Sequence, residues 1–366
     1  MNDMNDIAYM HLAYSLAEKA IGRTSPNPYV GAVVVKDGVI IGHGFHEGPG
    51  QPHAEIVALR RAGRRAKGAT LYVTLEPCVH WGRTPPCVDA VLPAELARMV
   101  VSSLDPNPLV FRKGLRRVRA AGIPVTFGVL EDRNRRLNEA YTKYITRKIP
   151  FITLKAAITL DGRMATRTFD SRWISSAASR DYIHLVRAEN DAIMVGIHTV
   201  LRDDPLLTVR HPNWPGKRIT RVILDPGLRF PLDARLLATL GRGAVIAVAN
   251  GRADRAKAVA LNKAGVEILT LPGHGAALDL GRVFAELGRR EIASVLVEGG
   301  GRVATSLLES RLADKAILAI SPRLIGGDAS VSVFGGRGAD IVADALSMTS
   351  VSVFRLGEDM IVEGYL

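Results

Sequence analysis

The first quarter of the chain contains one histidine, two cysteines and one glutamate whose types and spacing could form a catalytic metal site. His53 and Glu55 stand two positions apart, and Cys78 and Cys87 follow later in the sequence. Imidazole and thiolate groups suit zinc, and a catalytic zinc site uses three protein ligands and keeps a fourth position open for water. We therefore predict that His53, Cys78 and Cys87 bind zinc. Glu55 is close enough to His53 to transfer protons to and from the reacting water without being a ligand.

The spacing of these residues matches part of the signature of zinc-dependent nucleobase deaminases. That signature is H-x-E followed by P-C-x-x-C, and its glutamate is the general acid/base. His53 and Glu55 match the first half, and Pro77 with Cys78 begins the second half. Cys87, however, stands nine positions after Cys78 instead of three. The pattern indicates hydrolytic deamination, with a second half that is longer than usual.

The elements that must position these residues are indicated by the flanking sequence. Residues 70–75 are typical of a buried strand, and this strand should end at Glu76 and Pro77. We therefore expect Cys78 at a strand-to-helix turn. A helix is indicated over residues 51–59, beginning just after a proline. A helix N-terminus lowers the pKa of a nearby thiol and favours the thiolate that zinc requires. These contexts together favour a metal site.

Two alternatives remain open for the same residues. Taken one at a time, a histidine at a helix start and buried thiols are commonly structural. A closed structural zinc site is the second alternative, and it would need a fourth Cys or His ligand. The nearest candidates are His46 and His80, although a water is the more consistent fourth ligand.

Length and composition indicate a globular protein of two domains. A chain of 366 residues is long for one core, and its apolar fraction of 47% is ample for globular packing. No apolar run approaches the ~18–20 residues of a membrane span, so we predict no membrane partner. The acidic start, residues 1–6, argues against a secretory signal. If both cysteines bind metal, no disulfide can form, and the cytoplasm is the expected compartment.

The net charge of +12 suggests a nucleic-acid partner, but its distribution does not. The basic clusters lie at residues 60–67 and 112–119, in short amphipathic segments that end at Gly68 and Gly122. No aromatic residues are interleaved with them, as a stacking surface for bases would require. We therefore predict no nucleic-acid partner. A small phosphorylated substrate is sufficient to make a basic surface useful.

The first half of the chain alternates between helix and strand patterns. The predicted elements are a helix over 7–20, a hairpin over 30–44 with an Asp37-Gly38 turn, and strands over 70–75, 98–103 and 123–128. Further helical segments separate these strands, which predicts a mixed sheet with helices on both faces, an α/β/α sandwich. A polar, basic stretch then leads to Pro150. We place the domain boundary there, giving domains 1–147 and 148–366.

The second half predicts another α/β domain with a largely parallel sheet. Its predicted strands are 151–157, 192–195, 221–225, 244–249, 266–271, 294–298 and 315–320, followed by an antiparallel pair at 351–356 and 360–366. After residues 294–298 comes a turn of three glycines, Gly299 to Gly301, and then a helical segment. Such a turn allows backbone amides to approach a phosphate. It is weak as a dinucleotide fingerprint, and a tight structural turn remains the alternative.

Both halves of the chain also contain longer sequence motifs. In the first half they are residues 26–31 (PNPYVG), His46 with 52–55 (PHAE), 74–78 (TLEPC), 82–87 (GRTPPC) and 105–108 (DPNP). In the second half they are Lys155, 160–162 (LDG), 171–174 (SRWI), 199–201 (TVL), 203–205 (DDP), 207–210 (LTVR) and 298–300 (EGG). With these motifs the chain resembles the bifunctional deaminase/reductases of riboflavin biosynthesis over nearly its whole length. The GRTPPC run accounts for the long cysteine spacing.

The resemblance implies two folds and two activities. The first domain would be similar to cytidine deaminases and would hydrolyse the C2 amino group of a diaminopyrimidinone that carries a ribosylamino 5-phosphate. The second would resemble dihydrofolate reductase and would use NADPH to reduce the ribosyl group to ribityl. The cofactors implied are one zinc ion per deaminase domain and NADPH. Relatives of this kind pair through their reductase domains, so we expect a homodimer.

The resemblance also implies roles for individual residues. Catalytic roles fall to Glu55, Lys155 and Glu298. The pyrimidine of the deaminase substrate would contact Asn27, His46, Arg83, Asp105 and Asn107. The reductase substrate would contact Ser171, Arg187, Leu207 and Arg210, with the two arginines on its phosphate. NADPH would contact Ile158, Trp173, Thr199, Asp203, Gly299, Gly300 and Gly301.

Some of these residues have simpler explanations, and one position departs from the family. Asn27 and Asn107 could be turn residues beside prolines, and Asp203 could cap a helix or a turn. His198 stands where the family usually has a small residue, beside the expected cofactor site, which puts NADPH affinity in doubt.

Two rival functions remain. One is a nucleic-acid base deaminase with the same zinc chemistry, which predicts salt-dependent binding to RNA or DNA. The other is a non-catalytic scaffold that binds zinc and a nucleotide.

Overall fold

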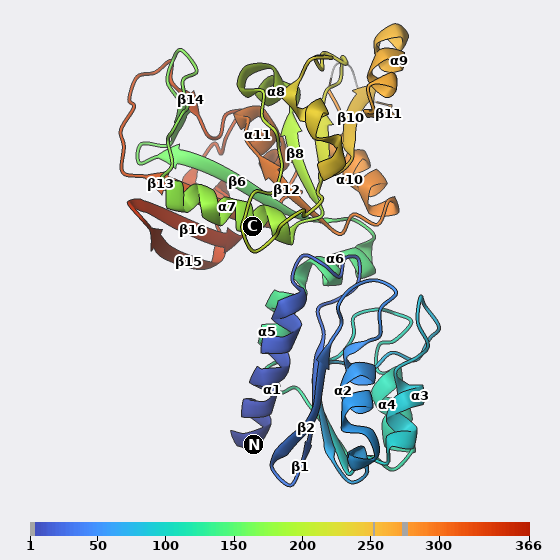
Figure 1. The fold of residues 1–366 in the computed structure, drawn as a ribbon. Coiled ribbons are helices and arrows are strands. Elements are labelled where there is room, and N and C mark those ends of the chain that lie inside the picture. The colour runs from blue at the N-terminus through green and yellow to red at the C-terminus, as the bar shows by residue number, and fades with distance from the viewer. Residues whose placement is uncertain (1–3, 252, 273–276) are drawn as a thin grey trace. The chain divides into compact units, whose positions relative to one another are not determined.

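The chain forms two compact units, residues Met1–Lys148 and Ile149–Leu366. The computed structural model describes residues 4–251, 253–272 and 277–366 (Figure 1). None of the helices in these described ranges combines the length and apolar character that crossing a membrane requires. Each unit has its own sheet, and each is described separately below.

The first unit is a five-stranded mixed sheet covered by helices on both faces (Figure 1). Its strands, in sheet order, are β2 (Val39–Phe45), β1 (Gly31–Lys36), β3 (Thr70–Leu75), β4 (Arg98–Ser103) and β5 (Val125–Phe127). Its helices are α1 (Met4–Ala17), α2 (Ala54–Ala62), α3 (Val88–Val91), α4 (Lys113–Ala120), α5 (Glu131–Leu137) and α6 (Glu139–Arg147). β1 is antiparallel to both of its neighbours, and β3, β4 and β5 are parallel. The predicted sandwich is confirmed.

Strand alternation places an apolar core on each face of this sheet. Along β1, Val34 faces the cluster that contains the apolar side chains of α2, α3 and α4, whereas Val33 faces α1. Helix α1 approaches the sheet so closely that a Cβ on Gly31 would lie 1.9 Å from the Ala13 carbonyl oxygen. Only glycine fits there, and this contact fixes α1 against the strand that leads to the site.

The second unit is built on a nine-stranded sheet. In sheet order its strands are β11 (Glu267–Leu271), β10 (Val245–Asn250), β9 (Thr220–Leu224), β8 (Ala192–Gly196), β12 (Ser294–Glu298), β6 (Phe151–Thr159), β13 (Lys315–Ser321), β16 (Asp359–Tyr365) and β15 (Thr349–Leu356). Its helices are α7 (Ala177–Glu189), α8 (Ile197–Asp203), α9 (Arg255–Lys263), α10 (Leu280–Arg289) and α11 (Gly301–Glu309), and a small sheet pairs β7 (Arg163–Ala165) with β14 (Val331–Ser332). The strands from β11 to β13 are parallel, and β16 is antiparallel to β13 and β15. The predicted α/β domain, with its antiparallel C-terminal pair, is confirmed.

The surroundings of Cys78 differ from the sequence prediction. β3 ends at Leu75, but the next helix, α3, begins only at Val88. The cysteine directly before a helix is therefore Cys87, which is the N-cap residue of α3. The intervening run contains two adjacent prolines and a glycine, which disfavour a helix. Cys78 still contacts this helix start, because the Cys87 backbone N–H donates to Cys78 Sγ over 3.2 Å.

Candidate functional site

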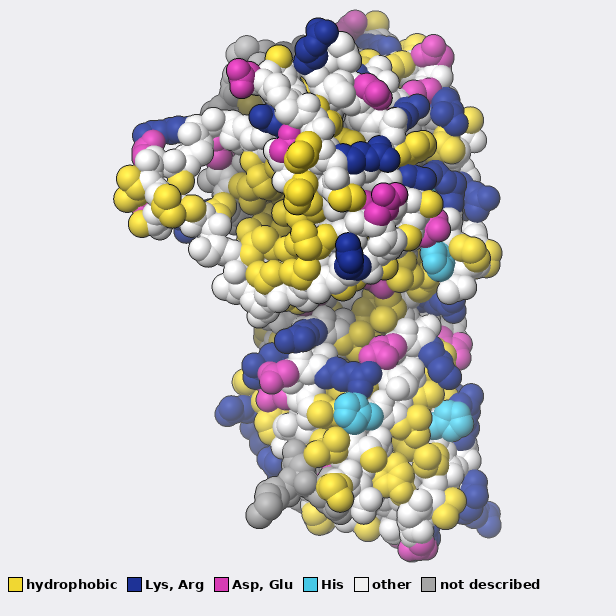
Figure 2. Space-filling view, turned by 90° about the vertical axis from the view of Figure 1, so that its left-hand side faces the viewer, with side chains coloured by type: hydrophobic (Ala, Val, Ile, Leu, Met, Phe, Trp, Pro, Cys, Tyr) yellow, Lys and Arg dark blue, Asp and Glu magenta, His cyan; other side chains and the backbone are white. Residues whose placement is uncertain are grey.

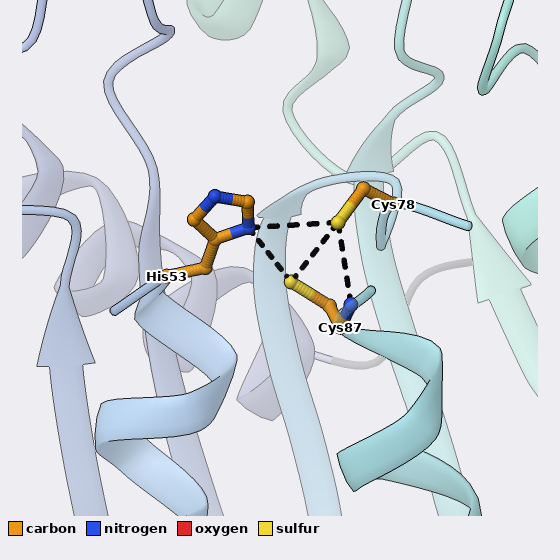
Figure 3. A group of neighbouring side chains, drawn as sticks. All are labelled: His53, Cys78 and Cys87. Atoms are coloured by element: carbon orange, nitrogen blue, oxygen red, sulfur yellow. Dashed lines mark hydrogen bonds between the residues drawn. The ribbon is translucent and has the colours of Figure 1, made fainter. Parts of the chain in front are cut away.

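Three elements of the first unit bring the predicted zinc ligands together (Figure 3). His53 is the N-cap residue of α2, Cys78 follows β3, and Cys87 precedes α3. His53 Nδ1 lies 2.9 Å from Cys87 Sγ and 3.5 Å from Cys78 Sγ, and the two sulfurs are 3.4 Å apart. In the described parts of the chain this is the one cluster of three or more His, Cys, Asp or Glu donors suited to a metal.

The geometry of these donors fits zinc. With Zn–S near 2.3 Å and Zn–N near 2.0–2.1 Å, tetrahedral coordination separates the donors by about 3.6–3.8 Å. Two of the three separations are within a few tenths of an ångström of that value, and the third needs a small outward movement of His53. His46 does not join the cluster, because its Nε2 lies 3.0 Å from Asn27 Nδ2 and its Nδ1 lies 3.3 Å from the Pro52 carbonyl oxygen. The set of three thus corresponds to an open, catalytic type of site.

Thr84 fixes the orientation of the histidine ligand. Its Oγ1 lies 3.0 Å from His53 Nε2. With the proton on Nε2 donated to this hydroxyl, Nδ1 presents its lone pair to the metal position. Partners of this kind orient metal-bound histidines and raise ligand affinity. Thr84 is absent from the sequence-predicted set, although it belongs to the GRTPPC run that carries Cys87.

Glu55 lies in the first turn of α2 and is only 3% exposed. Burial raises the pKa of its carboxyl to about 7; the charge of His53 acts against this shift, and Cys78 adds to it. A carboxyl with a pKa near neutrality both accepts and donates protons readily, as general acid/base catalysis requires. The same side chain hydrogen-bonds Cys87, which places it beside the metal donors.

Two of the predicted pyrimidine contacts, Asn27 and His46, lie next to the metal donors. The His46 ring contacts the His53 ring edge-on, with centroids 5.2 Å apart. Burial lowers the pKa of His46. With its proton on Nδ1, the neutral ring accepts a hydrogen bond from Asn27 Nδ2 and donates one to Pro52. Asn27 is therefore oriented by the site and is not only a turn residue.

Asp105 and Asn107, the second pair of predicted contacts, lie on the loop after β4 and are 5% and 9% exposed. The Asn107 backbone N–H donates to Asp105 Oδ1 over 2.9 Å, and Tyr141 OH donates to the same oxygen over 2.8 Å. Burial raises the pKa of Asp105 to about 6. Arg83, the fifth predicted contact, is exposed on the loop before Cys87.

Glu76 holds the loop that carries Asp105. Its carboxylate accepts backbone N–H groups from Asp105 at 3.3 Å, Arg112 at 3.0 Å and Leu115 at 3.1 Å. A Cβ on Gly114 would lie 2.1 Å from the Pro77 carbonyl oxygen, so α4 packs tightly against this segment. No sequence pattern predicts this role for Glu76, because the backbone groups that it binds lie 29 to 39 positions further along the chain.

The predicted reductase residues line a cavity of about 1340 Å³ in the second unit. The cavity lies at the carboxyl ends of β8 and β12, where ligands of parallel α/β sheets commonly bind. The predicted residues that line it are Lys155, Ser171, Trp173, Arg187, Thr199, Asp203, Leu207, Arg210, Glu298, Gly299, Gly300 and Gly301.

Ile158 is the one predicted reductase residue that does not line the cavity. It packs with Ala156 and Val333 in a small apolar cluster. Alternate residues of a strand face opposite sides, and along β6 the cavity side belongs to Lys155 and Ala157. Strand alternation therefore accounts for the position of Ile158.

A buried ionic group forms one wall of the cavity. Glu298 and Lys155 are neighbours across β12 and β6. Arg187, on α7, donates Nε–H to Glu298 Oε1 at 2.5 Å and Nη2–H to Oε2 at 2.9 Å. Its Nη1 donates to the Thr208 carbonyl oxygen at 3.1 Å. The planar fork of Arg187 is therefore directed at Glu298, and two of its five N–H groups remain for a substrate.

The charged residues of this group shift one another's pKa values. Burial lowers the pKa of Lys155, and the carboxylate of Glu298 partly opposes that shift. Burial acts most strongly, to raise the pKa of Glu298, but Arg187, Lys155 and His184 together outweigh it, and the net shift of the pKa is downward. Glu298 is thus held as a carboxylate, and Lys155 gives up its proton more readily than an exposed lysine.

Several cavity residues are absent from the predicted set. Arg180 and His184 line the cavity from the same helix as Arg187. Their spacing of three to four residues places all three on one helix face, which is a signal the sequence contains. His198, which the sequence already placed beside the expected cofactor site, also lines the cavity; it is exposed, and its Nε2 lies 3.3 Å from Arg229 Nη2.

The glycine turn borders the same cavity. Gly299 and Gly300 have φ of 72° and 77°, a conformation that glycine adopts without strain. α11 begins at Gly301, and no side chain caps it. The turn therefore has a conformational reason for its glycines, and it also brings the N-terminus of α11 to the cavity, where a phosphate is favoured.

Comparison with known proteins relates each unit to a described family. The family model "Cytidine and deoxycytidylate deaminase zinc-binding region" matches residues 3–103, and "RibD C-terminal domain" matches residues 150–362. The riboflavin biosynthesis protein RibD of Aquifex aeolicus (strain VF5) is 46% identical over 98% of this chain and 97% of its own length. RibD of Escherichia coli (strain K12) is 38% identical over 98% of both chains.

Two solved structures are similar in fold to this chain over 99% of its length. A crystal form of RibD from Acinetobacter baumannii superposes with a TM-score of 0.88 at 36% identity, covering 99% of this chain and 98% of that one. A diaminohydroxyphosphoribosylaminopyrimidine deaminase/5-amino-6-(5-phosphoribosylamino)uracil reductase from Thermotoga maritima gives 0.87 at 36% identity, with the same coverage. The chain therefore belongs to the RibD family, and it is a bifunctional enzyme of riboflavin biosynthesis with a zinc-dependent deaminase unit and an NADPH-dependent reductase unit.

Proposed function

We propose that the first unit hydrolyses the C2 amino group of 2,5-diamino-6-(5-phosphoribosylamino)pyrimidin-4-one, and that the second reduces the ribosyl group of the product to ribityl. The observation that supports the first step best is the convergence of His53, Cys78 and Cys87 on one point with Glu55 beside them. The name of the Thermotoga relative supports the substrate.

In the deaminase unit, this chain's residues would bind the pyrimidine and move protons. Zinc, when bound, supplies a water whose pKa is lowered to about 7. As the oxygen of the reacting water bonds to C2, Glu55 would pass one water proton to the ring nitrogen and then the other to the amino group, which leaves as ammonia when the C2–N bond breaks. Asn27 and His46, which lie next to the donor cluster, would hold the ring together with Arg83, Asp105 and Asn107.

In the reductase unit, the residues would align the substrate with the cofactor. NADPH supplies a hydride to C1 of the opened sugar. Lys155 would donate a proton beside C1, and Arg187 would hold the neighbouring Glu298 carboxylate in position. Ser171, Leu207 and Arg210, with the remaining N–H groups of Arg187, would bind the substrate and its phosphate. Trp173, Thr199, Asp203 and the Gly299 to Gly301 turn would bind NADPH.

The direct test is an assay of the purified protein with this pyrimidine and NADPH. Ammonia release and loss of NADPH absorbance are followed separately, and the products are identified by mass spectrometry. We expect one amino group replaced by oxygen, then a gain of two hydrogens. Ammonia release from RNA or DNA but not from the free pyrimidine would overturn the proposed substrate.

We further propose that the protein is a homodimer, with β15 at the interface. This strand is an edge of the nine-stranded sheet, and Val351 and Val353 are 51% and 58% exposed on it. Figure 2 shows hydrophobic side chains gathered on the face of the second unit that carries this edge. Exposed apolar edge strands are commonly covered by another chain.

Light scattering should therefore report a mass of two chains, and Val353→Asp should shift the protein toward the monomer. A monomeric wild-type protein would contradict the interface.

We also propose a cytoplasmic location, because both cysteines are free thiols in the metal cluster. Fractionation of the source cells would test this location.

A further inference from the structure

We propose that Asn138 and Tyr141 complete the deaminase site by holding the two loops that carry Asn27 and Asp105. The inference rests on the proposed function of the first unit. Both residues lie beyond residues 3–103, which match the zinc-binding deaminase region, and before residues 150–362, which match the reductase. They belong to the stretch that the sequence pattern marks only as a junction between domains.

Asn138 holds the first loop through the backbone of Tyr29. It lies between α5 and α6 and is 1% exposed. Its Oδ1 accepts the Tyr29 N–H over 2.7 Å, and its Nδ2 donates to the Tyr29 carbonyl oxygen over 3.1 Å. The amide thus pairs with both backbone groups of Tyr29, as a neighbouring strand would. A further bond from Nδ2 to Asn134 Oδ1, 2.9 Å long, fixes the amide itself.

The position of Tyr29 determines where Asn27 points. Only one residue separates them, and Tyr29 OH accepts the Gly22 N–H over 2.9 Å at the other end of the side chain. Asn27 in turn lies 3.0 Å from His46 Nε2, beside the metal donors. Without Asn138, the Tyr29 backbone would lose two part-buried hydrogen bonds, and the loop would shift away from His46 more easily.

Tyr141 holds the second loop through the carboxylate of Asp105. The ring is 8% exposed on α6, and its hydroxyl donates to Asp105 Oδ1 over 2.8 Å. The Asn107 N–H donates to the same oxygen. Among the described residues, both bonds that this carboxylate accepts end on Oδ1, so Oδ2 is left to accept an N–H group of the pyrimidine. Tyr141 therefore sets the rotamer of a substrate-binding side chain.

The same unit contains a matched pair that does not contact these residues. Tyr72, 4% exposed, donates its hydroxyl to Asp6 Oδ1 over 3.0 Å, and Asp6 is 1% exposed. This pair joins β3 to α1, and Arg98 completes it. Tyr72→Phe and Tyr141→Phe each delete one buried hydroxyl–carboxylate bond, so their effects on stability should be similar. Only Tyr141→Phe should change how substrate binds.

The test compares Tyr141→Phe, Asn138→Asp and Tyr72→Phe in the full-length, zinc-loaded protein. Asn138→Asp keeps the acceptor for the Tyr29 N–H but removes both donor bonds. For Tyr141→Phe and Asn138→Asp we expect the KM of the pyrimidine in ammonia release to rise about three- to tenfold. Zinc content and the reductase activity of the same chain should stay at wild-type values. Tyr72→Phe should lower the melting temperature without changing KM.

Equal KM values for wild type, Tyr141→Phe and Asn138→Asp would overturn the inference, as would a KM increase in Tyr72→Phe of the same size. Loss of zinc from the two site variants would also overturn it, because the residues would then act on the metal site. If the wild-type protein releases no ammonia from the pyrimidine, the proposed function itself fails. The two failures are therefore distinguishable.

Discussion

Glu55→Gln is expected to lower the rate of ammonia release by about 10²- to 10⁴-fold while the protein keeps its zinc. Glutamine has the size and shape of glutamate, but it cannot accept a proton from water or pass one to the ring nitrogen. Glu55 is 3% exposed, so no solvent group replaces it easily. None of the three metal donors is altered. The measurement is metal analysis of the purified variant together with its ammonia release.

Glu95→Gln is the matched control for this variant. Glu95 belongs to the same unit but is exposed, with its carboxylate 2.6 Å from Lys67 Nζ. The same chemical change at this position should leave ammonia release unaltered. If Glu55→Gln released ammonia at the wild-type rate with full zinc content, Glu55 would not be the proton carrier, and a non-catalytic zinc unit would become the better explanation.

Lys155→Met is expected to reduce NADPH oxidation by about 10²-fold or more while deamination continues at the wild-type rate. Methionine retains much of the aliphatic length but has no charge and no proton to donate. The Arg187–Glu298 ion pair remains, so the wall of the cavity keeps its internal partner. The measurement follows NADPH absorbance with the deaminated pyrimidine as substrate, and ammonia release with the original one.

Lys315→Met serves as its control. Lys315 lies on β13, the strand next to β6, and is outside the cavity lining. Its substitution should leave NADPH oxidation intact. Loss of both activities in a folded Lys155→Met protein would contradict two independent sites, and unchanged NADPH oxidation would remove Lys155 from the reductase mechanism.

The sequence predicts the parts of the sites that depend on local patterns. The sequence predicts His53 and Glu55 at the start of a helix, and in the structure α2 begins directly after His53 with Glu55 in its first turn. Asp37-Gly38 predicts the β1–β2 hairpin because the turn needs positive φ, and these residues have φ of 50° and 76°. Of the reductase residues that the motif resemblance predicts, all but Ile158 line the cavity, whereas Arg180 and His184 line it without having been predicted.

The remaining contacts arise between segments that are distant in sequence. Asn138 contacts Tyr29 across 109 positions, and Tyr141 contacts Asp105 across 36. No local pattern marks such pairs, since a buried tyrosine or asparagine in a helical segment has the same composition whether or not its partner is a site residue. The helix start at Cys87 was also missed, because the length of the loop after Cys78 depends on how the loop packs.

Chelation tests the central account most directly. Metal is removed from the purified protein with a chelator, and ammonia release and NADPH oxidation are measured on the same sample before and after zinc is restored. We predict that metal removal abolishes ammonia release, that zinc restores it, and that reduction of the deaminated pyrimidine is unaffected throughout. Undiminished ammonia release from folded protein shown to be free of metal would contradict the account.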